Sequence, residues 1–377
     1  MNKPFLLSIL TLACSPAFAV VNGTPVDWPS HDNIVRLDGH PMWSGVIQDK
    51  KGQCTGTLIA GKYVLTAAHC LQKEGDIDTV TPVSGKEQAV QFNKFKRHPN
   101  YNPDEDFGGE DVGWIELDNA SIDYQHIQFF PTLTSSSLTK GQDIFVTGFG
   151  GTALDASPLN RADFQFDKTL GTAPYGKPYI IYITQKNTSH TTGGDSGSAW
   201  TNANNEIIGV HKGSDRLNGE KETYGTDLHY ASDFILDTVN GWHYPTVAQA
   251  KGQMTITIQS LHQSVNNPDP SNEMWTEGDV KLVTDSSSCF QQRVTPYTQC
   301  TLRIESQGGE GTLWLSANES IKINKPIKQP DSGNGSASSS GGGALGFWSL
   351  LMLLGFTLRR QKLALRSLPR LKRFLSQ

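Results

Sequence analysis

The chain contains few cysteines, no internal repeat, no recognisable cofactor motif and no apolar run of the ~20 residues that a membrane-spanning helix needs. These absences argue against a repeat architecture and predict neither a cofactor nor a metal. Hydrophobic residues make up 36% of the sequence and charged residues 18%, which is ordinary for a globular protein and argues against disorder. With 377 residues, the chain is long enough for one large or two medium domains.

Basic charge is scarce outside the C-terminal end. The formal net charge is −5, but residues 359–377 hold seven of the 32 Lys and Arg residues and no acid. Residues 20–358 contain 24 basic and 37 acidic groups, a net charge of about −13. A protein region with this excess of acidic residues is a poor candidate for binding nucleic acid.

Residues 1–19 predict a secretory signal peptide. Lys3 precedes an apolar run from Phe5 to Leu12, and Ala17-Phe-Ala19 has the small-x-small pattern that signal peptidase cuts. A lipoprotein signal through Cys14 is the alternative, but the three residues before that cysteine form a poor lipobox. We therefore predict export, with signal peptidase as a processing partner.

Export implies an oxidising compartment, in which cysteines form disulfides. Four cysteines remain after the signal: Cys54, Cys70, Cys289 and Cys300. Neither pair has the spacing of zinc ligands, so we predict two disulfides rather than a metal site. Cys289 and Cys300 are expected to close a hairpin. Acidic residues between Glu74 and Glu87 could hold calcium, but a solvated acidic loop is the favoured interpretation.

Residues 20–243 alternate short apolar segments with turns rich in Gly, Asn and Pro, as in Thr57–Leu65 and Asp143–Gly148. This pattern predicts an all-β barrel or sandwich. Tyr230–Val239 predicts one amphipathic helix, ended by Asn240-Gly241. A helix after a β region is typical of a domain end.

Residues 245–327 predict a small β domain. Their alternating runs are Met254–Ile258, Val280–Val283, Thr301–Ile304 and Thr312–Leu315. Residues 328–343 contain mostly Pro, Ser, Gly and Asn and predict a flexible linker.

The end of the chain has a short apolar segment followed by a basic one. Residues 344–358 are fifteen mostly apolar residues, which is short for a spanning helix and permits only marginal insertion. The basic residues 359–377 would then stay in the cytoplasm by the positive-inside rule.

Three separated segments supply a nucleophile, a base and a carboxylate. Ser196 lies in Gly194-Asp-Ser-Gly197, where glycines permit a tight turn and leave the backbone N–H groups of Gly194 and Ser196 as oxyanion donors. A serine hydroxyl needs an imidazole to take its proton, and His69 is the candidate. Asp111 would orient that imidazole and hold its tautomer.

These segments, in this order, resemble the chymotrypsin/trypsin family of serine endopeptidases over residues 20 to about 243. Thr66-Ala-Ala-His-Cys70 resembles the family's histidine motif, and Cys54 lies where the family places the partner of that cysteine. His98-Pro-Asn-Tyr-Asn102 leading into Asp111 resembles the aspartate region, and Val146-Thr-Gly-Phe-Gly150 a mid-chain turn. The resemblance implies a two-barrel protease domain with a C-terminal helix, a Cys54–Cys70 disulfide and a His69, Asp111, Ser196 triad.

The resemblance also implies a mode of activation. In the family, a new N-terminus of the form Ile/Val-Val-x-Gly folds inward and its ammonium pairs with the aspartate before the serine. Here Ala19 is followed by Val20-Val-Asn-Gly23, and Asp195 precedes Ser196. We therefore expect signal cleavage itself to create the activating terminus. The alternative is that Val20 merely begins the first strand.

The specificity positions differ from those of trypsin. Trypsin-like members carry an aspartate six residues before the serine, where this chain has His190, so a preference for Arg or Lys is not supported. Thr191 and His211 instead resemble the pocket of bacterial glutamyl endopeptidases, in which a threonine and a histidine bind the substrate carboxylate. Those relatives typically have asparagine in place of Asp195 and use the terminal ammonium in the pocket, and one terminus cannot do both. The alternative for His211 is a strand residue with another partner.

The tail resembles the Gly-Gly C-terminal sorting signals of certain Gram-negative secreted proteases. Gly341-Gly-Gly343 precedes the short apolar segment and the Arg-rich end, and a rhomboid-type intramembrane protease removes such tails. A plain transmembrane anchor is the alternative.

Together these features predict a secreted or surface-attached endopeptidase that is transiently anchored through residues 344–358. It would hydrolyse protein or peptide substrates through an acyl-enzyme on Ser196. The alternative is a catalytically inactive member of the family that serves as an adhesion or binding module.

Overall fold

The computed structural model describes residues 20–40, 42–43, 46–47, 50–118, 122–150, 159–171, 175–217 and 220–326. The predicted signal peptide, linker, apolar segment 344–358 and basic tail lie outside these residues, as does the Gly-Gly motif. The described residues, which end at Pro326, belong to one compact unit. In the part of the chain that is described, no helix has both the length and the apolarity to cross a membrane.

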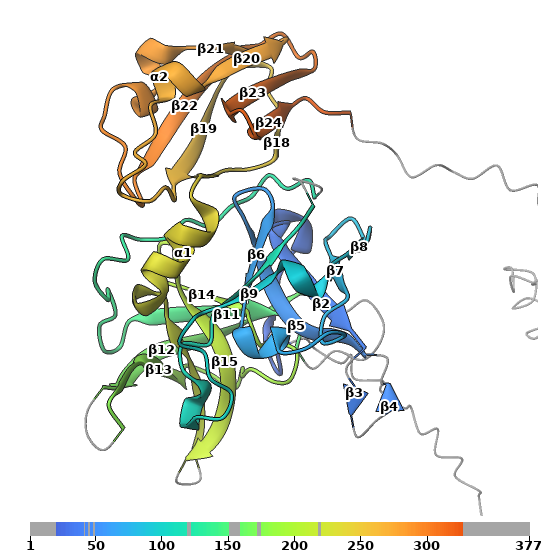
Figure 1. Ribbon diagram of the computed structural model, residues 1–377, viewed down its shortest axis with the longest axis vertical. Coiled ribbons are helices and arrows are strands. Elements are labelled where there is room, and N and C mark those ends of the chain that lie inside the picture. The colour runs from blue at the N-terminus through green and yellow to red at the C-terminus, as the bar shows by residue number, and fades with distance from the viewer. Residues whose placement is uncertain are drawn as a thin grey trace, which may run out of the picture. The chain divides into compact units, whose positions relative to one another are not determined.

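The first large sheet is built from residues 34–116 and is antiparallel (Figure 1). Its order is β8-β7-β2-β5-β6-β10-β9. The strands are β2 (Ile34–Gly39), β5 (Lys50–Ile59), β6 (Tyr63–Thr66), β7 (Thr79–Thr81), β8 (Gln88–Ala89), β9 (Phe95–Arg97) and β10 (Gly113–Glu116). Ala60 and Gly61 turn between β5 and β6 with positive φ angles of 51° and 77°. A two-stranded sheet pairs β3 (Met42–Trp43) with β4 (Val46–Ile47).

The second large sheet closes into a barrel. Its order is β1-β12-β11-β14-β15-β16-β13, and a further pairing of β12 with β13 closes the ring, while β1 pairs with β12. The strands are β1 (Thr24–Pro25), β11 (Asp143–Gly148), β12 (Asn160–Leu170), β13 (Lys177–Gln185), β14 (Ala199–Thr201), β15 (Ile207–Leu217) and β16 (Glu220–Asp227). In β11 and the first half of β12, alternate residues are buried, as a half-buried strand requires. The all-β prediction is confirmed.

Short helical turns connect these strands, and one α-helix follows the barrel. The 3₁₀ turns are η1 (Trp28–His31), η2 (Ala68–Leu71), η3 (Phe92–Lys94), η4 (Asp106–Gly108) and η5 (Leu228–Ala231). The predicted helix is present as α1 (Ser232–Val239), which Asn240 ends in a left-handed conformation with φ 38°. Its expected first residues form η5 instead, because the Asp227 side chain caps that turn by accepting the His229 N–H.

A second β region follows, as predicted, and consists of two four-stranded sheets. One has the order β17-β19-β22-β21 and the other β18-β24-β23-β20. The strands are β17 (Trp242–His243), β18 (Val247–Ala248), β19 (Gly252–Ser260), β20 (Trp275–Gly278), β21 (Lys281–Leu282), β22 (Gln299–Ser306), β23 (Gly311–Ser316) and β24 (Glu319–Ile323). The helical elements are α2 (Pro270–Glu273), η6 (Thr284–Ser286) and η7 (Ser288–Phe290). A separate apolar cluster that includes Trp242, Leu302 and Ile321 forms its core.

Both predicted disulfides are present, Cys54–Cys70 and Cys289–Cys300. The expectation that the second closes a hairpin is wrong. Cys289 lies in the 3₁₀ turn η7 and Cys300 in strand β22, so the bond joins a turn to a strand. The sequence between them forms a turn and loop rather than a second paired strand.

Hydrogen bonds link the second β region to the first part of the chain. His243 is fully buried, accepts the Ala60 N–H at Nδ1 (3.0 Å) and donates from Nε2 to the Gln128 carbonyl (2.9 Å). Burial lowers the pKa of His243 to about 4, which favours this neutral form. Because β17 pairs with β19, His243 belongs to the sheet of the second region. The division into domains at 243–245 therefore stays a prediction.

Candidate active site

His69 and Asp111 meet at the edge of the first sheet. His69 lies in η2, directly after β6, and the Cys54–Cys70 disulfide ties this turn to β5. The two oxygens of Asp111 accept two N–H groups of His69, the backbone N–H at 2.8 Å and the ring Nδ1–H at 2.6 Å. This paired contact fixes the ring orientation and leaves Nε2 as the basic nitrogen.

Asp111 is fully buried, whereas the His69 side chain is 29% exposed. Burial by itself raises the pKa of Asp111, but the charges of His69 and Lys212 and the His69 hydrogen bonds outweigh it and hold that pKa below its usual range. The backbone N–H of Asp111 donates to Thr226 Oγ1 at 3.2 Å. The carboxylate is therefore an ionised acceptor bound by His69, and the backbone of the same residue is fixed by Thr226.

The turn that carries Ser196 depends on glycine. Gly194 and Gly197 have φ angles of 103° and 84°, which other residues rarely adopt. A Cβ atom on Gly197 would lie 2.0 Å from Thr66 Oγ1 and 2.9 Å from Ala67 N, so this turn packs directly against the segment that leads to His69. Thr55 N–H donates to the Ser196 carbonyl at 2.8 Å and ties the turn to β5.

The three predicted triad residues therefore lie in one region, on turns and loops that connect strands of the two large sheets. Ser196 is half-buried, and its Oγ donates to the Lys212 carbonyl at 3.4 Å. Among the bonds formed by the described residues, none joins Ser196 Oγ to His69. Catalytic hydrogen bonds are often long or misaligned in unliganded enzymes and tighten around the substrate.

The predicted oxyanion donors belong to the same turn. Thr55 Oγ1 donates to the Gly194 carbonyl at 2.9 Å and holds that peptide in place. Within the described part of the chain, the N–H groups of Gly194 and Ser196 have no acceptor. Two N–H groups without acceptors beside a serine hydroxyl can stabilise a developing oxyanion.

Asp195 turns inward, away from the nucleophile. Its carboxylate is fully buried and accepts the N–H groups of Gly150 and Thr192, both at 2.8 Å. A Cβ on Gly148 or Gly150 would lie 2.4 Å from this carboxylate, so both glycines make room for it. Val20 is also fully buried, and its nitrogen donates to the Gly150 carbonyl at 2.8 Å. Gly150 thus contacts both members of the predicted activation pair.

The three predicted specificity residues, His190, Thr191 and His211, differ from one another in their local environments. His190 pairs its N–H with the Val21 carbonyl at 3.0 Å, and its Nδ1 contacts the Thr188 carbonyl of its own loop at 3.2 Å. Thr191 is buried, and its hydroxyl lies 3.3 Å from that of Ser214. Ser214 was not among the predicted specificity residues, because a serine three residues beyond a strand histidine carries no local signal.

His211 is buried, with 1% of its surface exposed, and its ring packs near that of Trp200 (centroids 6.1 Å apart). Burial and the nearby His69 charge lower the pKa of His211 to about 3, so the ring is neutral at physiological pH. Its Nδ1 has no hydrogen-bond partner among the described residues. A buried nitrogen of this kind can bind an incoming polar group.

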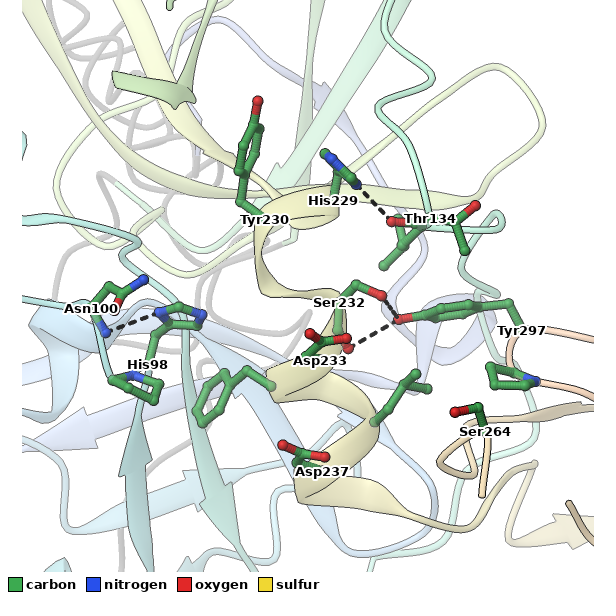
Figure 2. A pocket seen from close by; sticks show the side chains of 15 residues that line it. His98, Asn100, Thr134, His229, Tyr230, Ser232, Asp233, Asp237, Ser264 and Tyr297 are labelled. Atoms are coloured by element: carbon green, nitrogen blue, oxygen red, sulfur yellow. Dashed lines mark hydrogen bonds between the residues drawn. The ribbon is translucent and has the colours of Figure 1, made fainter. Parts of the chain in front are cut away.

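A cavity of about 710 Å³ lies elsewhere, beside α1 (Figure 2). Its lining includes His98, Asp233, Asp237 and Tyr297, but none of the triad residues. Figure 2 shows the hydroxyls of Ser232 and Tyr297 hydrogen-bonded to each other across it, at 2.8 Å. None of the predicted catalytic, oxyanion or specificity residues is among the described residues that line this cavity.

Comparison with known proteins agrees with this geometry. The family model described as Trypsin matches residues 35–235, a span that contains His69, Asp111 and Ser196. The chain belongs to the trypsin-like serine protease family. Membership implies a peptide hydrolase acting on protein or peptide substrates.

Individual relatives of this trypsin-family chain are distant. Chymotrypsin-like elastase family member 1 of Bos taurus is 25% identical over 187 residues, which cover 47% of this chain and 67% of the relative. Trypsin I-P1 of Gallus gallus is 29% identical over 108 residues, which cover 28% of this chain and 42% of the relative.

Two solved structures from Vibrio cholerae are also similar. The VesB protease is 19% identical with a TM-score of 0.43, and the match covers 81% of this chain and all of that one. The secreted serine protease VesC is 16% identical with a TM-score of 0.42, and the match covers 80% of this chain and 70% of that one.

Proposed function

We propose that this chain is an exported serine endopeptidase that cleaves peptide bonds through an acyl-enzyme on Ser196. The observation that carries the proposal is the buried Asp111 carboxylate, which accepts both N–H groups of His69. Export is supported by the signal-like residues 1–19 and by the two disulfides.

The proposed reaction follows from the groups present. Ser196 Oγ attacks the substrate carbonyl carbon while His69 Nε2 takes the hydroxyl proton, and Asp111 stabilises the resulting imidazolium. The oxyanion accepts the N–H groups of Gly194 and Ser196. His69 then protonates the leaving amine, and the acyl group stays on Ser196. A water molecule, deprotonated by His69, hydrolyses this ester and restores the enzyme.

Activation by the Val20 terminus is part of the proposal. Once Ala19 is removed, the Val20 nitrogen becomes an ammonium group beside Gly150, next to the Asp195 carboxylate. That charge would hold Asp195 inward and thereby keep the Gly194 N–H in the oxyanion position. The buried Val20 side chain and the glycines around Asp195 support this assignment.

Extending the mature chain by several residues ahead of Val20 is therefore expected to lower kcat/KM by at least about 10²-fold, the effect of losing one oxyanion donor. The measurement compares a chain that starts at Val20 with one that carries a removable extension. Cleaving the extension from the same preparation serves as the control and should restore activity. Full activity in the extended chain would refute the activation pair.

We also propose that the specificity pocket accepts a glutamate side chain. The Thr191 and Ser214 hydroxyls and the neutral His211 ring supply hydrogen bonds without an anionic group, which suits a carboxylate. The experiment is a panel of matched peptides with Glu, Gln, Arg, Phe or Ala before the scissile bond.

In that panel, cleavage after Glu should exceed cleavage after Gln by about tenfold or more, because a hydrogen bond to a charged group contributes about 1.5–3 kcal/mol. The Glu and Gln peptides differ in charge but hardly in size, so their ratio isolates the carboxylate. Preferential cleavage after Arg would overturn this assignment and leave the endopeptidase proposal intact.

A further inference from the structure

Lys212 is a charged residue beside the triad that the proposed reaction does not use. It lies on β15, directly after His211, and its side chain is only 13% exposed. Its Nζ atom is 3.5 Å from Asp111 Oδ2, and its backbone carbonyl accepts the Ser196 hydroxyl at 3.4 Å. One residue therefore contacts both the carboxylate and the nucleophile of the triad.

The loop before Asp111 is shaped around this ammonium group. Lys212 Nζ also donates to the carbonyl oxygen of Phe107, a residue held at the unusual φ of 63°. The next residue, Gly108, has a φ of 57°, and a Cβ there would lie 3.0 Å from Lys212 Nζ. Backbone bonds between Asn102 N and Gly108 O and between Gly108 N and Glu105 O keep the loop in this form. The loop thus presents a carbonyl to the ammonium and leaves space for it.

We propose that Lys212 is a positioning residue of the triad, whose ammonium group anchors Asp111 and the 102–110 loop and thereby holds the His69 ring for proton transfer. The inference rests on the proposed function, because it acts through the triad base. A carboxylate that faces both an imidazole and an ammonium stabilises an added proton on the imidazole less than an unshared carboxylate does.

The ionisable groups around this pair support a cationic Lys212. Burial lowers the pKa of Lys212, while the Asp111 charge opposes that shift. The charge of Lys177 also lowers the pKa of Lys212, but Lys177 lies 3.6 Å from Glu105, which partly compensates that charge. His211 is neutral at physiological pH, and burial and the Asp111 charge raise the pKa of Tyr101 to about 12, so neither adds charge there.

The test is the pH profile of kcat/KM for the mature enzyme and the variants Lys212→Met and Lys212→Ser. Methionine keeps the length of the side chain without its charge, and serine removes most of the side chain as well. Loss of the positive charge favours the imidazolium, so the acid limb should move to higher pH by roughly half to one unit in both variants. Lys168→Met is the matched control. Its ammonium is partly exposed and pairs with Glu222, so its profile should match the wild type.

An acid limb that stays in place in both Lys212 variants would overturn the inference while leaving the proposed function standing. A wild-type enzyme that neither cleaves peptides nor reacts at Ser196 would refute the proposed function instead. A second measurement needs neither a folded variant nor an active enzyme. Brief acetylation of the native protein, read by mass spectrometry, should modify Lys212 at least about tenfold more slowly than Lys168, a ratio that corresponds to about 1.4 kcal/mol of protection. Equal rates would rule out the buried ion pair.

Discussion

The Ser196→Ala variant is expected to lose about 10⁶-fold in kcat, the scale known for removing the serine of other catalytic triads. The reason is chemical, because in the proposed reaction Ser196 Oγ is the atom that forms the acyl bond. The fold should be unaffected, since the half-buried hydroxyl makes a single long hydrogen bond to the described residues, to the Lys212 carbonyl. Steady-state hydrolysis of a peptide, with circular dichroism of the same sample, measures both effects.

Ser264→Ala provides the control for this variant. Ser264 lines the cavity beside α1 and has no part in the proposed reaction, so this substitution should leave kcat unchanged. A Ser196→Ala variant that keeps more than about 1% of wild-type kcat would place the nucleophile elsewhere.

The Asp111→Asn variant is expected to lose about 10⁴-fold in kcat, the magnitude known for this change in the trypsin-type template. The Asp111 carboxylate accepts two N–H groups from His69, one at each oxygen. An asparagine amide has one oxygen and one NH₂ group, so it can accept only one of them and faces the other with a donor. The imidazole must then adopt the wrong tautomer or lose its anchor.

Asp118→Asn is the matched control for this second variant. Asp118 follows strand β10, which Asp111 precedes, but it is largely exposed and forms an ion pair with Lys94 at 3.4 Å. Exposed pairs of this kind contribute little, so its kcat should stay within a factor of two or so of the wild type. An Asp111→Asn variant within tenfold of wild type would contradict the orienting role assigned to Asp111.

The candidate triad residues could be proposed from the sequence because each lies in a short segment whose local chemistry is distinctive. Ser196 lies between two glycines that its turn requires, and His69 adjoins a cysteine whose disulfide holds the turn. The all-β architecture could be predicted from the alternation of buried and exposed residues, which is a local property of each strand.

Other features depend on contacts that no local pattern encodes. Lys212 meets Asp111 only because β15 passes the loop that precedes β10, a contact between residues 101 positions apart in the sequence. Ser214 meets Thr191 for a similar reason. The Cys289–Cys300 bond was predicted correctly, but its setting was not, because the spacing of two cysteines does not distinguish a hairpin from a turn beside a strand.

The most direct test of the central claim is fluorophosphonate labelling of the mature protein, followed by mass spectrometry of its peptides. Such reagents react with a serine only when an adjacent base activates it and an oxyanion site receives the phosphoryl oxygen. We expect one adduct per molecule, on Ser196, and none in the Ser196→Ala variant. A native, correctly processed protein that stays unlabelled, or that is labelled at another residue, would contradict it and favour a binding module built on a protease fold.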